Sequence, residues 1–212
     1  MEVDTLATTV GEIIQDETYG AAWIIGKFNE CLLLAATLCR IPGLQTSKEV
    51  SAAAGATTIT MPSNFLHDLF HIRTAAYPQG IVIAPNIKEL KACIHPDETG
   101  AIQIACLDGK YLHFGPIPEA DETLELHYYR KPEELIAGGE FPNYLPEIFQ
   151  KELFQNYALK EAYMLIEDGV DGKMPNTQKY SGAFSAALGA LEAFYPNAPK
   201  ARPNIRRAWS DF

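Results

Sequence analysis

The stretch LHYYRKPEEL, residues 126–135, decides how the middle of this chain is expected to fold. Two sets of side chains alternate along it: Leu126, Tyr128 and Arg130 on one side, and His127, Tyr129 and Lys131 on the other. A period of two is typical of a β-strand with one buried face. Proline has no backbone N–H for a sheet, so Pro132 ends the pattern. We interpret residues 123–131 as the closing strand of a sheet. His127, Tyr129 and Lys131 are a possible contact surface between subunits.

The segment that precedes this strand carries further strand signals. In AIQIACLDGKYLHFGP (101–116), two alternating apolar runs flank Asp108-Gly109, which predicts a β-hairpin with a type I′ turn. Shorter runs at 57–62, 64–77 and 81–84 predict more strands, and a short helix begins at Asn86. Residues ~47–131 are therefore expected to form an antiparallel sheet that carries one small helix.

Helical periodicity flanks the sheet on both sides. Helices are predicted over residues 5–14 and 21–39, from Pro146 to Ile166, and over 177–195. The predicted fold class is α+β: the N- and C-terminal helices form an antiparallel bundle, into which the β-sheet domain is inserted. The predicted divisions are 1–46 (N-terminal helices), 47–140 (β-rich domain), 141–195 (C-terminal helices) and 196–212 (an extended basic and aromatic tail).

Charge is distributed unevenly along the chain. The net charge is −10, which argues against a general nucleic-acid binder, because phosphate binding needs clustered basic residues. The last 17 residues, PNAPKARPNIRRAWSDF, carry +3, so residues 1–195 carry −13. The tail combines charged and aromatic side chains that are common at interface cores and hot spots: Lys200, Arg202, Arg206, Arg207, Trp209 and Phe212. We expect it to dock onto a partner, and plain disorder is the alternative.

Membrane insertion and secretion are not expected. No apolar run approaches the ~20 residues needed to cross a bilayer, and the first residues lack the basic region of a signal peptide. Cys31 and Cys39 lie on one predicted helix, about 12 Å apart along its axis, which is too far for a disulfide. We expect reduced thiols.

Enzymatic chemistry has weak support. His67 and His71 in HDLFH have the i, i+4 spacing that grips zinc on a helix, but this segment is expected to be extended. Glycosidases need two carboxyl groups across a cleft. The acidic pairs here sit in predicted turns or helix ends: Asp97-Glu98, Asp121-Glu122, Glu133-Glu134 and Glu167-Asp168. We expect no catalytic residue, cofactor or metal. The alternative function is a glycosidase or a metal hydrolase.

Three stretches together resemble the head–tail adaptor proteins of tailed bacteriophages: MPSNFLHDLFHI (61–72), DGKYLHFGPIPEADETLELHYYRKPEEL (108–135) and FPNYLPEIFQKELFQNYALKEAYML (141–165). FNECLLLAA (28–36) fits the family's N-terminal helix, and the likeness spans about residues 8–166.

The resemblance implies a virion structural protein at the head–tail junction, made in the host bacterial cytoplasm. It implies a ring, usually of twelve copies, below the portal protein. Such a ring extends the DNA channel and presents a platform for a downstream tail or stopper protein. Double-stranded DNA would pass through without specific binding, and the C-terminal segment would dock onto the portal. With this origin, the enzymatic alternative is a phage-encoded cell-wall glycosidase or metal hydrolase.

Overall fold

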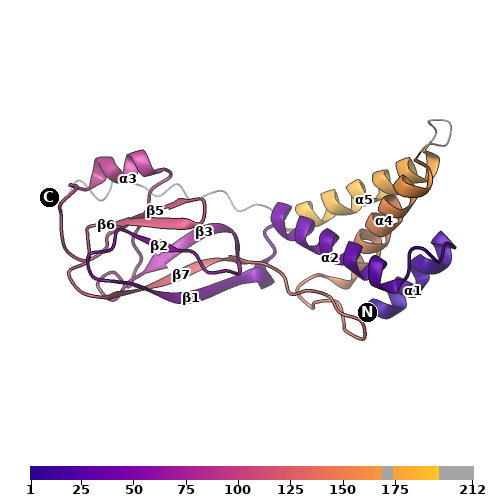
Figure 1. Ribbon diagram of the computed structural model, residues 1–212, viewed down its shortest axis with the longest axis horizontal. Coiled ribbons are helices and arrows are strands. Elements are labelled where there is room, and N and C mark those ends of the chain that lie inside the picture. Colours follow the sequence, from indigo (N-terminus) through magenta and orange to yellow (C-terminus); the bar gives the residue numbers. More distant parts are fainter. Residues whose placement is uncertain (169–173, 196–212) are drawn as a thin grey trace. The chain divides into compact units, whose positions relative to one another are not determined.

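The computed structural model describes residues 1–168 and 174–195. Within these ranges it contains five α-helices and two β-sheets, which confirms the α+β class (Figure 1). The chain divides into two compact units. Residues 1–44 with 131–195 form the helical unit, and residues 45–130 form the β unit. That the predicted boundaries at 46, 140 and 195 separate independent domains stays a prediction.

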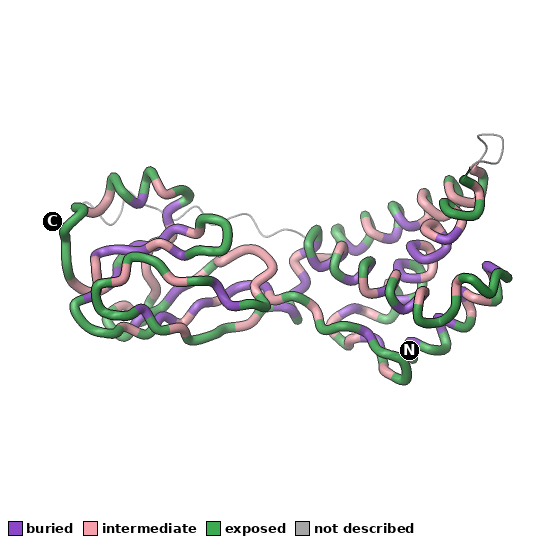
Figure 2. The backbone as a smooth tube through the Cα atoms, viewed as in Figure 1, coloured by how far each residue is buried: buried purple, intermediate pink, exposed green. Residues whose placement is uncertain are grey.

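Four helices build the helical unit: α1 (Val3–Ile14), α2 (Ala21–Leu38), α4 (Glu147–Ile166) and α5 (Pro175–Phe194). Helix α4 packs against the other three. Rings from α2, α4 and the segment before α4 meet in the core, with centroid distances of 5.9 Å for Phe28–Phe141, 5.7 Å for Phe28–Phe154 and 4.6 Å for Phe141–Phe154. The buried residues lie on the facing sides of these helices (Figure 2). The regular antiparallel bundle stays a prediction.

Helix α2 is long and apolar enough to cross a membrane by length and composition alone. It buries one side in the helical unit, through Ile24, Ile25, Phe28, Cys31, Leu32, Ala35 and Ala36. A helix that packs in the core of a helical protein buries one side in this way. A short 3₁₀ turn, Pro42–Leu44, follows α2.

The segment 131–146 is tied to the first two helices by hydrogen bonds. The Asn29 side chain accepts from the Leu135 backbone N–H (2.7 Å) and donates to the Leu135 carbonyl (3.0 Å). The Gly138 N–H donates to the Asp4 carboxylate (2.8 Å). Because buried backbone groups need partners, these contacts fix the path of the chain after it leaves the β unit.

Two sheets form the β unit. The first has the order β1 (Gln45–Ala52), β7 (Glu122–Arg130), β3 (Phe65–Arg73), and its pairs are antiparallel. The second has the order β2 (Thr58–Thr60), β6 (Tyr111–Gly115), β5 (Ile104–Asp108), β4 (Val82–Ile83).

The two sheets share one core, and a helix covers the outer side of the second sheet. Leu124, Leu126 and Tyr128 of β7 meet Ala105, Leu112 and Phe114 in one buried cluster. Helix α3 (Ile87–Cys93) packs on β5 through Leu90, which clusters with Ile104 and Cys106. Figure 1 shows α3 on the side of β5 and β6, away from β1 and β7. The first sheet therefore has its outer face uncovered by any helix or strand of the β unit.

The predicted single antiparallel sheet is wrong in four respects. The strands divide between two sheets, and β4 pairs with β5 in parallel. Strand β1 was not foreseen. In the hairpin, Asp108 pairs with Tyr111, so the two-residue turn is Gly109-Lys110, with φ of 58° at Gly109. The different turn position moves the pairing by two residues, so Leu112 and Phe114 stay on the buried face of the hairpin.

We expect Asn29→Ala to lower the free energy of unfolding by about 1–3 kcal/mol, because it leaves two partly buried Leu135 backbone groups without their partner. Thr37→Ala is the matched control on the same helix, since its exposed hydroxyl bonds only the Leu33 carbonyl within α2. Urea unfolding followed by circular dichroism measures both. Equal effects would contradict the anchoring role of Asn29.

Glu167 at the end of α4 caps the start of α5. Its carboxylate accepts from the backbone N–H groups of Asn176 (3.1 Å) and Thr177 (3.0 Å), and from both side chains. Partial desolvation raises the pKa of Glu167, but these hydrogen bonds from Thr177 and Asn176 lower it more, so the net pKa lies below its usual value.

Because this pKa is lower in the folded state, the stabilisation is present above the unfolded pKa of about 4.3 and is lost as pH falls through the folded value. Glu167→Gln should lower the melting temperature at pH 7 and change it little at pH 2. Thermal unfolding at both pH values tests this, with the neighbouring Asp168→Asn as control. The same loss at pH 2 would contradict the capping role.

Candidate interaction surface

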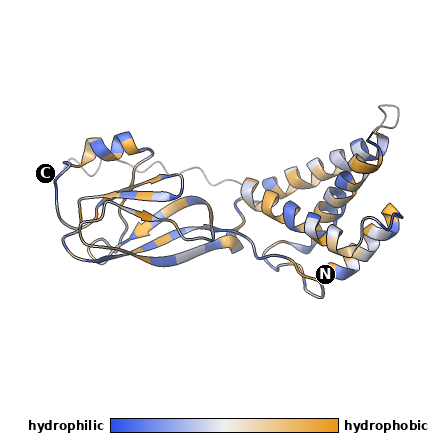
Figure 3. Ribbon diagram, viewed as in Figure 1, coloured by the Kyte–Doolittle hydropathy of each residue, from blue (hydrophilic) through white to orange (hydrophobic). Residues whose placement is uncertain are grey.

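The outer face of the first sheet is built from rows of side chains on three strands. Residues directly opposite in an antiparallel pair project to the same face. The register places Tyr129 of β7 between Gln45 and His67, His127 between Ser47 and His71, and Glu125 between Glu49 and Arg73. We call this surface the open face; it consists of Gln45, Ser47, Glu49, His67, Phe70, His71, Arg73, Glu125, His127 and Tyr129. Figure 3 shows hydrophilic and hydrophobic residues alternating along the strands of the β unit.

A bulge in β3 adds an aromatic ring to the open face. Between the pairs His67–Tyr129 and His71–His127, β3 has three residues where β7 has one. Asp68, one of these three residues, has a left-handed conformation (φ 50°), which aspartate tolerates better than most residues. Leu69 packs against the core and Phe70 projects outward. The bulge thus places a phenylalanine in solvent, 46% exposed.

Aromatic rings are in contact across β3 and β7. The Phe70 ring lies 5.8 Å from the Tyr129 ring and 6.3 Å from the His127 ring, between centroids. The His67 ring stacks on Tyr129 at 5.0 Å, and the Gln45 side-chain amide donates to the Tyr129 hydroxyl at 2.8 Å. These contacts bury Tyr129 and leave Phe70 outermost.

Charged groups and histidines continue the open face beyond Phe70. The Arg73 Nε–H donates to His71 Nε2 at 3.0 Å, so His71 is neutral and carries its proton on Nδ1. Burial lowers the pKa of His71, and the nearby charges of Arg73 and His127 lower it further, against the opposing effect of Glu125. His127 Nε2 lies 3.2 Å from Glu125 Oε1 in a geometry that makes no hydrogen bond, and Arg73 Nη1 lies 3.9 Å from Glu125 Oε2.

A glycine holds the neighbouring loop against His71. Gly80 has φ of 105°, and a Cβ at this position would overlap the His71 ring. The Gly80 N–H donates to the Tyr77 carbonyl, and the Ile81 N–H donates to the Ile72 carbonyl. Only glycine meets both the conformational and the steric requirement here. The loop therefore fixes one side of the His71 ring.

The structure brings together only part of the surface residues predicted from sequence. His127 and Tyr129 share the open face, whereas Lys131 lies beyond the end of β7, which stops at Arg130. His67 and His71, read from the sequence as strand histidines at a sheet surface or subunit contact, lie on the open face as well. Phe70 was missed, because simple alternation cannot place a residue inside a bulge. The segment 196–212, which holds the six predicted docking residues, lies outside the described residues.

The features considered for enzymatic chemistry have structural roles here. His67 and His71 lie on strand β3, so the helical geometry of a zinc motif is absent, and no group of three metal-ligating side chains occurs in residues 1–168 and 174–195. Carboxylates from the predicted acidic pairs accept backbone N–H bonds: Glu98 from His95, Asp121 from Ala54, Glu122 from Ile102 and Glu167 from Thr177. Burial raises the pKa of Cys31, which fits an unreactive core thiol.

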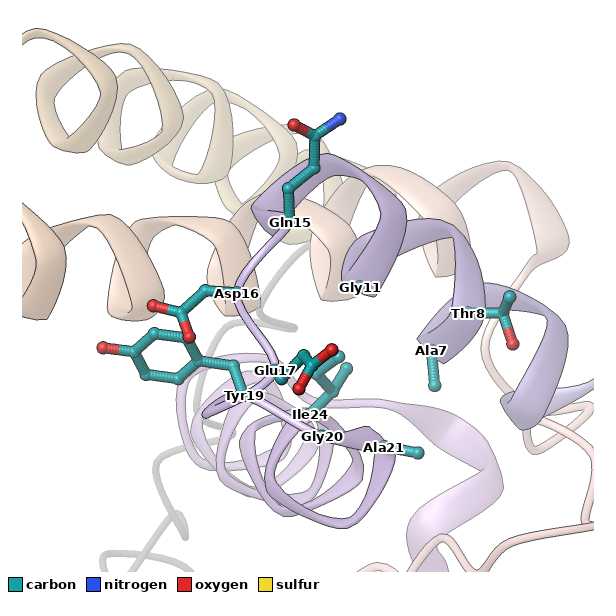
Figure 4. A pocket seen from close by; sticks show the side chains of 10 residues that line it. All are labelled: Ala7, Thr8, Gly11, Gln15, Asp16, Glu17, Tyr19, Gly20, Ala21 and Ile24. Carbon is teal, nitrogen blue, oxygen red and sulfur yellow. The ribbon is translucent and has the colours of Figure 1, made fainter.

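A shallow groove of about 380 Å³ lies between α1 and α2 (Figure 4). Its labelled side chains come from the two helices and the turn between them. Asp16 and Glu17 on this turn are exposed. Hydrogen bonds from the side chain and backbone of Thr18 lower the pKa of Asp16, which is typical of a turn carboxylate. The groove thus offers no buried titratable group for catalysis.

The family model described as SU10 adaptor protein matches residues 1–207. The chain belongs to this family. Membership confirms the resemblance to phage head–tail adaptor proteins and assigns the chain a structural, adaptor role in a bacteriophage particle. No curated protein matches the sequence.

The charge of Arg73 should control the protonation of His71 in this adaptor. We expect Arg73→Gln to raise the pKa of His71 towards its usual value without restoring it, because burial, the larger cause, remains. NMR titration of the imidazole ring protons measures this, and Lys48→Gln on the same sheet is the charge-matched control. An unchanged His71 titration would show that Arg73 does not act on the ring.

Because the folded-state pKa of His71 is lowered, the neutral ring favours folding. This contribution is complete above the unfolded pKa of about 6.5 and is lost as pH falls through the folded pKa.

Proposed function

We propose that this adaptor forms a ring below the portal, extends the DNA channel and provides the attachment platform for the next tail component. Family membership is the observation that carries the proposal, since it places the chain among adaptor proteins over residues 1–207. The two-unit architecture supports it, because two separate cores allow different surfaces to serve different neighbours. Ring formation by many copies is part of the proposal.

The charge of the protein suits a channel through which DNA slides. Residues 1–195 carry −13, so the adaptor has little capacity to release counterions from phosphate, which is the main source of non-specific DNA affinity. Weak, repulsive contact with the duplex allows packaging and ejection without a binding step. Double-stranded DNA is thus a passing ligand in this proposal and not a specific partner.

The basic segment 196–212 is the proposed portal anchor. Its opposite charge steers it towards an acidic partner surface, and Trp209, Arg206 and Arg207 are of the residue types that dominate interface energetics. In this proposal Lys200 and Arg202 contribute to electrostatic steering, and Phe212 adds apolar contact area.

Co-sedimentation with the cognate portal tests the proposal. The full chain should pellet with the portal, and simultaneous replacement of Arg206, Arg207 and Trp209 by alanine should weaken binding by about tenfold or more. A matched control replaces Lys88, Lys91 and Tyr111 of the β unit by alanine, which removes the same charge and one exposed aromatic ring. If the unmodified chain does not bind the portal, the proposal that this adaptor attaches to the portal is contradicted. Equal binding by the tail variant would contradict only the anchor.

A further inference from the structure

The open face has the composition of a docking surface. Its centre is aromatic, with Phe70 46% exposed above Tyr129 and His127. Interfaces place aromatic side chains at the centre and charged residues at the rim. Glu49, Glu125 and Arg73 form such a rim on one side of Phe70. No helix or strand of the β unit covers this arrangement, although α3 covers the corresponding face of the second sheet.

The bulge shows that the exposure of Phe70 is built into the fold. Regular pairing from His67 to His71 would need fewer residues on β3 and would leave no side chain in the position of Phe70. Instead, Asp68 adopts a positive φ, a conformation that costs free energy for residues other than glycine. Bulges commonly re-aim a side chain next to a functional surface. Phe70 is the side chain that this bulge re-aims.

The charges of the open face favour a cationic occupant. Glu49 and Glu125 lie directly opposite each other on β1 and β7, and like charges in this position destabilise a sheet. Arg73 approaches Glu125 only to 3.9 Å, and its Nε–H is used by His71. An arginine from outside would relieve the repulsion between the two carboxylates, and its guanidinium can bind a carboxylate through two parallel hydrogen bonds.

The sequence of this chain contains a segment with matching chemistry. In an extended chain, side chains two residues apart project to the same side and lie about 6.6 Å apart. Arg207 and Trp209 have this spacing, and so do Glu125 and His127 on β7. One extended segment could therefore present Arg207 to the carboxylates while Trp209 covers Phe70 and His127.

We propose that, in the adaptor that is not bound to a portal, segment 203–212 docks onto the open face, with Arg207 at Glu49 and Glu125 and Trp209 against Phe70. The contact shields the aromatic residues of both surfaces from water and occupies the basic segment until a portal competes for it. The part of this inference that concerns release to a portal rests on the proposed function. The docking itself does not.

Tryptophan fluorescence of the full chain tests the docking directly. The chain has two tryptophans, so Trp23→Phe leaves Trp209 as the sole reporter. Trp23 makes a ring contact with Tyr19, which phenylalanine can retain. Without portal, Trp209 should emit at shorter wavelength and be quenched less by acrylamide than in a synthetic peptide of residues 196–212. Identical emission and quenching in chain and peptide would overturn the proposal.

Variants on both partners identify the surface. Three variants are made in the Trp23→Phe background: Phe70→Ser, the double variant Glu49→Gln/Glu125→Gln, and Arg207→Ala. Each should shift the emission of Trp209 to that of the peptide. Tyr111→Ser is the control for Phe70, because Tyr111 is 45% exposed on β6, in the other sheet. Arg202→Ala is the control for Arg207. Far-ultraviolet circular dichroism checks that each variant is folded. Loss of protection by the controls but not by the open-face variants would overturn the proposal.

Two further measurements show whether the segment docks onto its own chain or onto a second copy, and separate docking from portal binding. Protection of Trp209 that falls on dilution places the segment on a second copy, and protection independent of concentration places it on its own chain; both support docking. Co-sedimentation with the portal is scored independently. Portal binding by a chain whose Trp209 is never protected would overturn this inference and leave the adaptor function standing.

Discussion

Strand β7 is the element on which the β unit depends, because it is paired on both edges and its two faces have opposite environments. Leu124, Leu126 and Tyr128 are fully buried, so any shift of β7 by one residue would turn them away from the core and turn Glu125, His127 and Tyr129 towards it. The burial of alternate residues therefore fixes the register with β1 and β3. The composition of the open face follows from that register.

The open face shows how local irregularity creates a surface that regular pairing would not. The bulge in β3 lets Leu69 stay with the core while Phe70 points to solvent. The same strand brings His71 and Arg73 beside Glu125 and His127. Family membership indicates a protein that works through contacts with its neighbours. Asp121, Glu98 and Glu167 accept backbone hydrogen bonds at turns and helix ends.

Sequence patterns located the helices and strands that bury several apolar side chains. They did not locate strand β1, which buries few. Strand 123–131, the short helix at Asn86 and the flanking helices were foreseen from periodicity, and the structure has β7, α3 and four longer helices there. Strand β1, QTSKEVSA, was missed because only Ala52 in it is buried. Backbone hydrogen bonds to β7 hold β1 in the sheet, and such bonds produce no hydrophobic pattern in the sequence. The parallel pairing of two-residue β4 has the same origin.

The sequence by itself determined the α+β class, the central strand, the alternation that puts His127 and Tyr129 opposite the core, and the family. These depend on local periodicity and on motifs that lie in order along the chain. Only the tertiary structure decided that the strands form two sheets, that α3 covers one of them, and that Phe70, His71 and Arg73 join His127 on the other. The pairing of β3 with β7 joins residues more than fifty positions apart, and the bulge in β3 interrupts the alternation at Leu69 and Phe70. Side chains far apart in the sequence become neighbours only when the backbone hydrogen bonds of the sheet select one register.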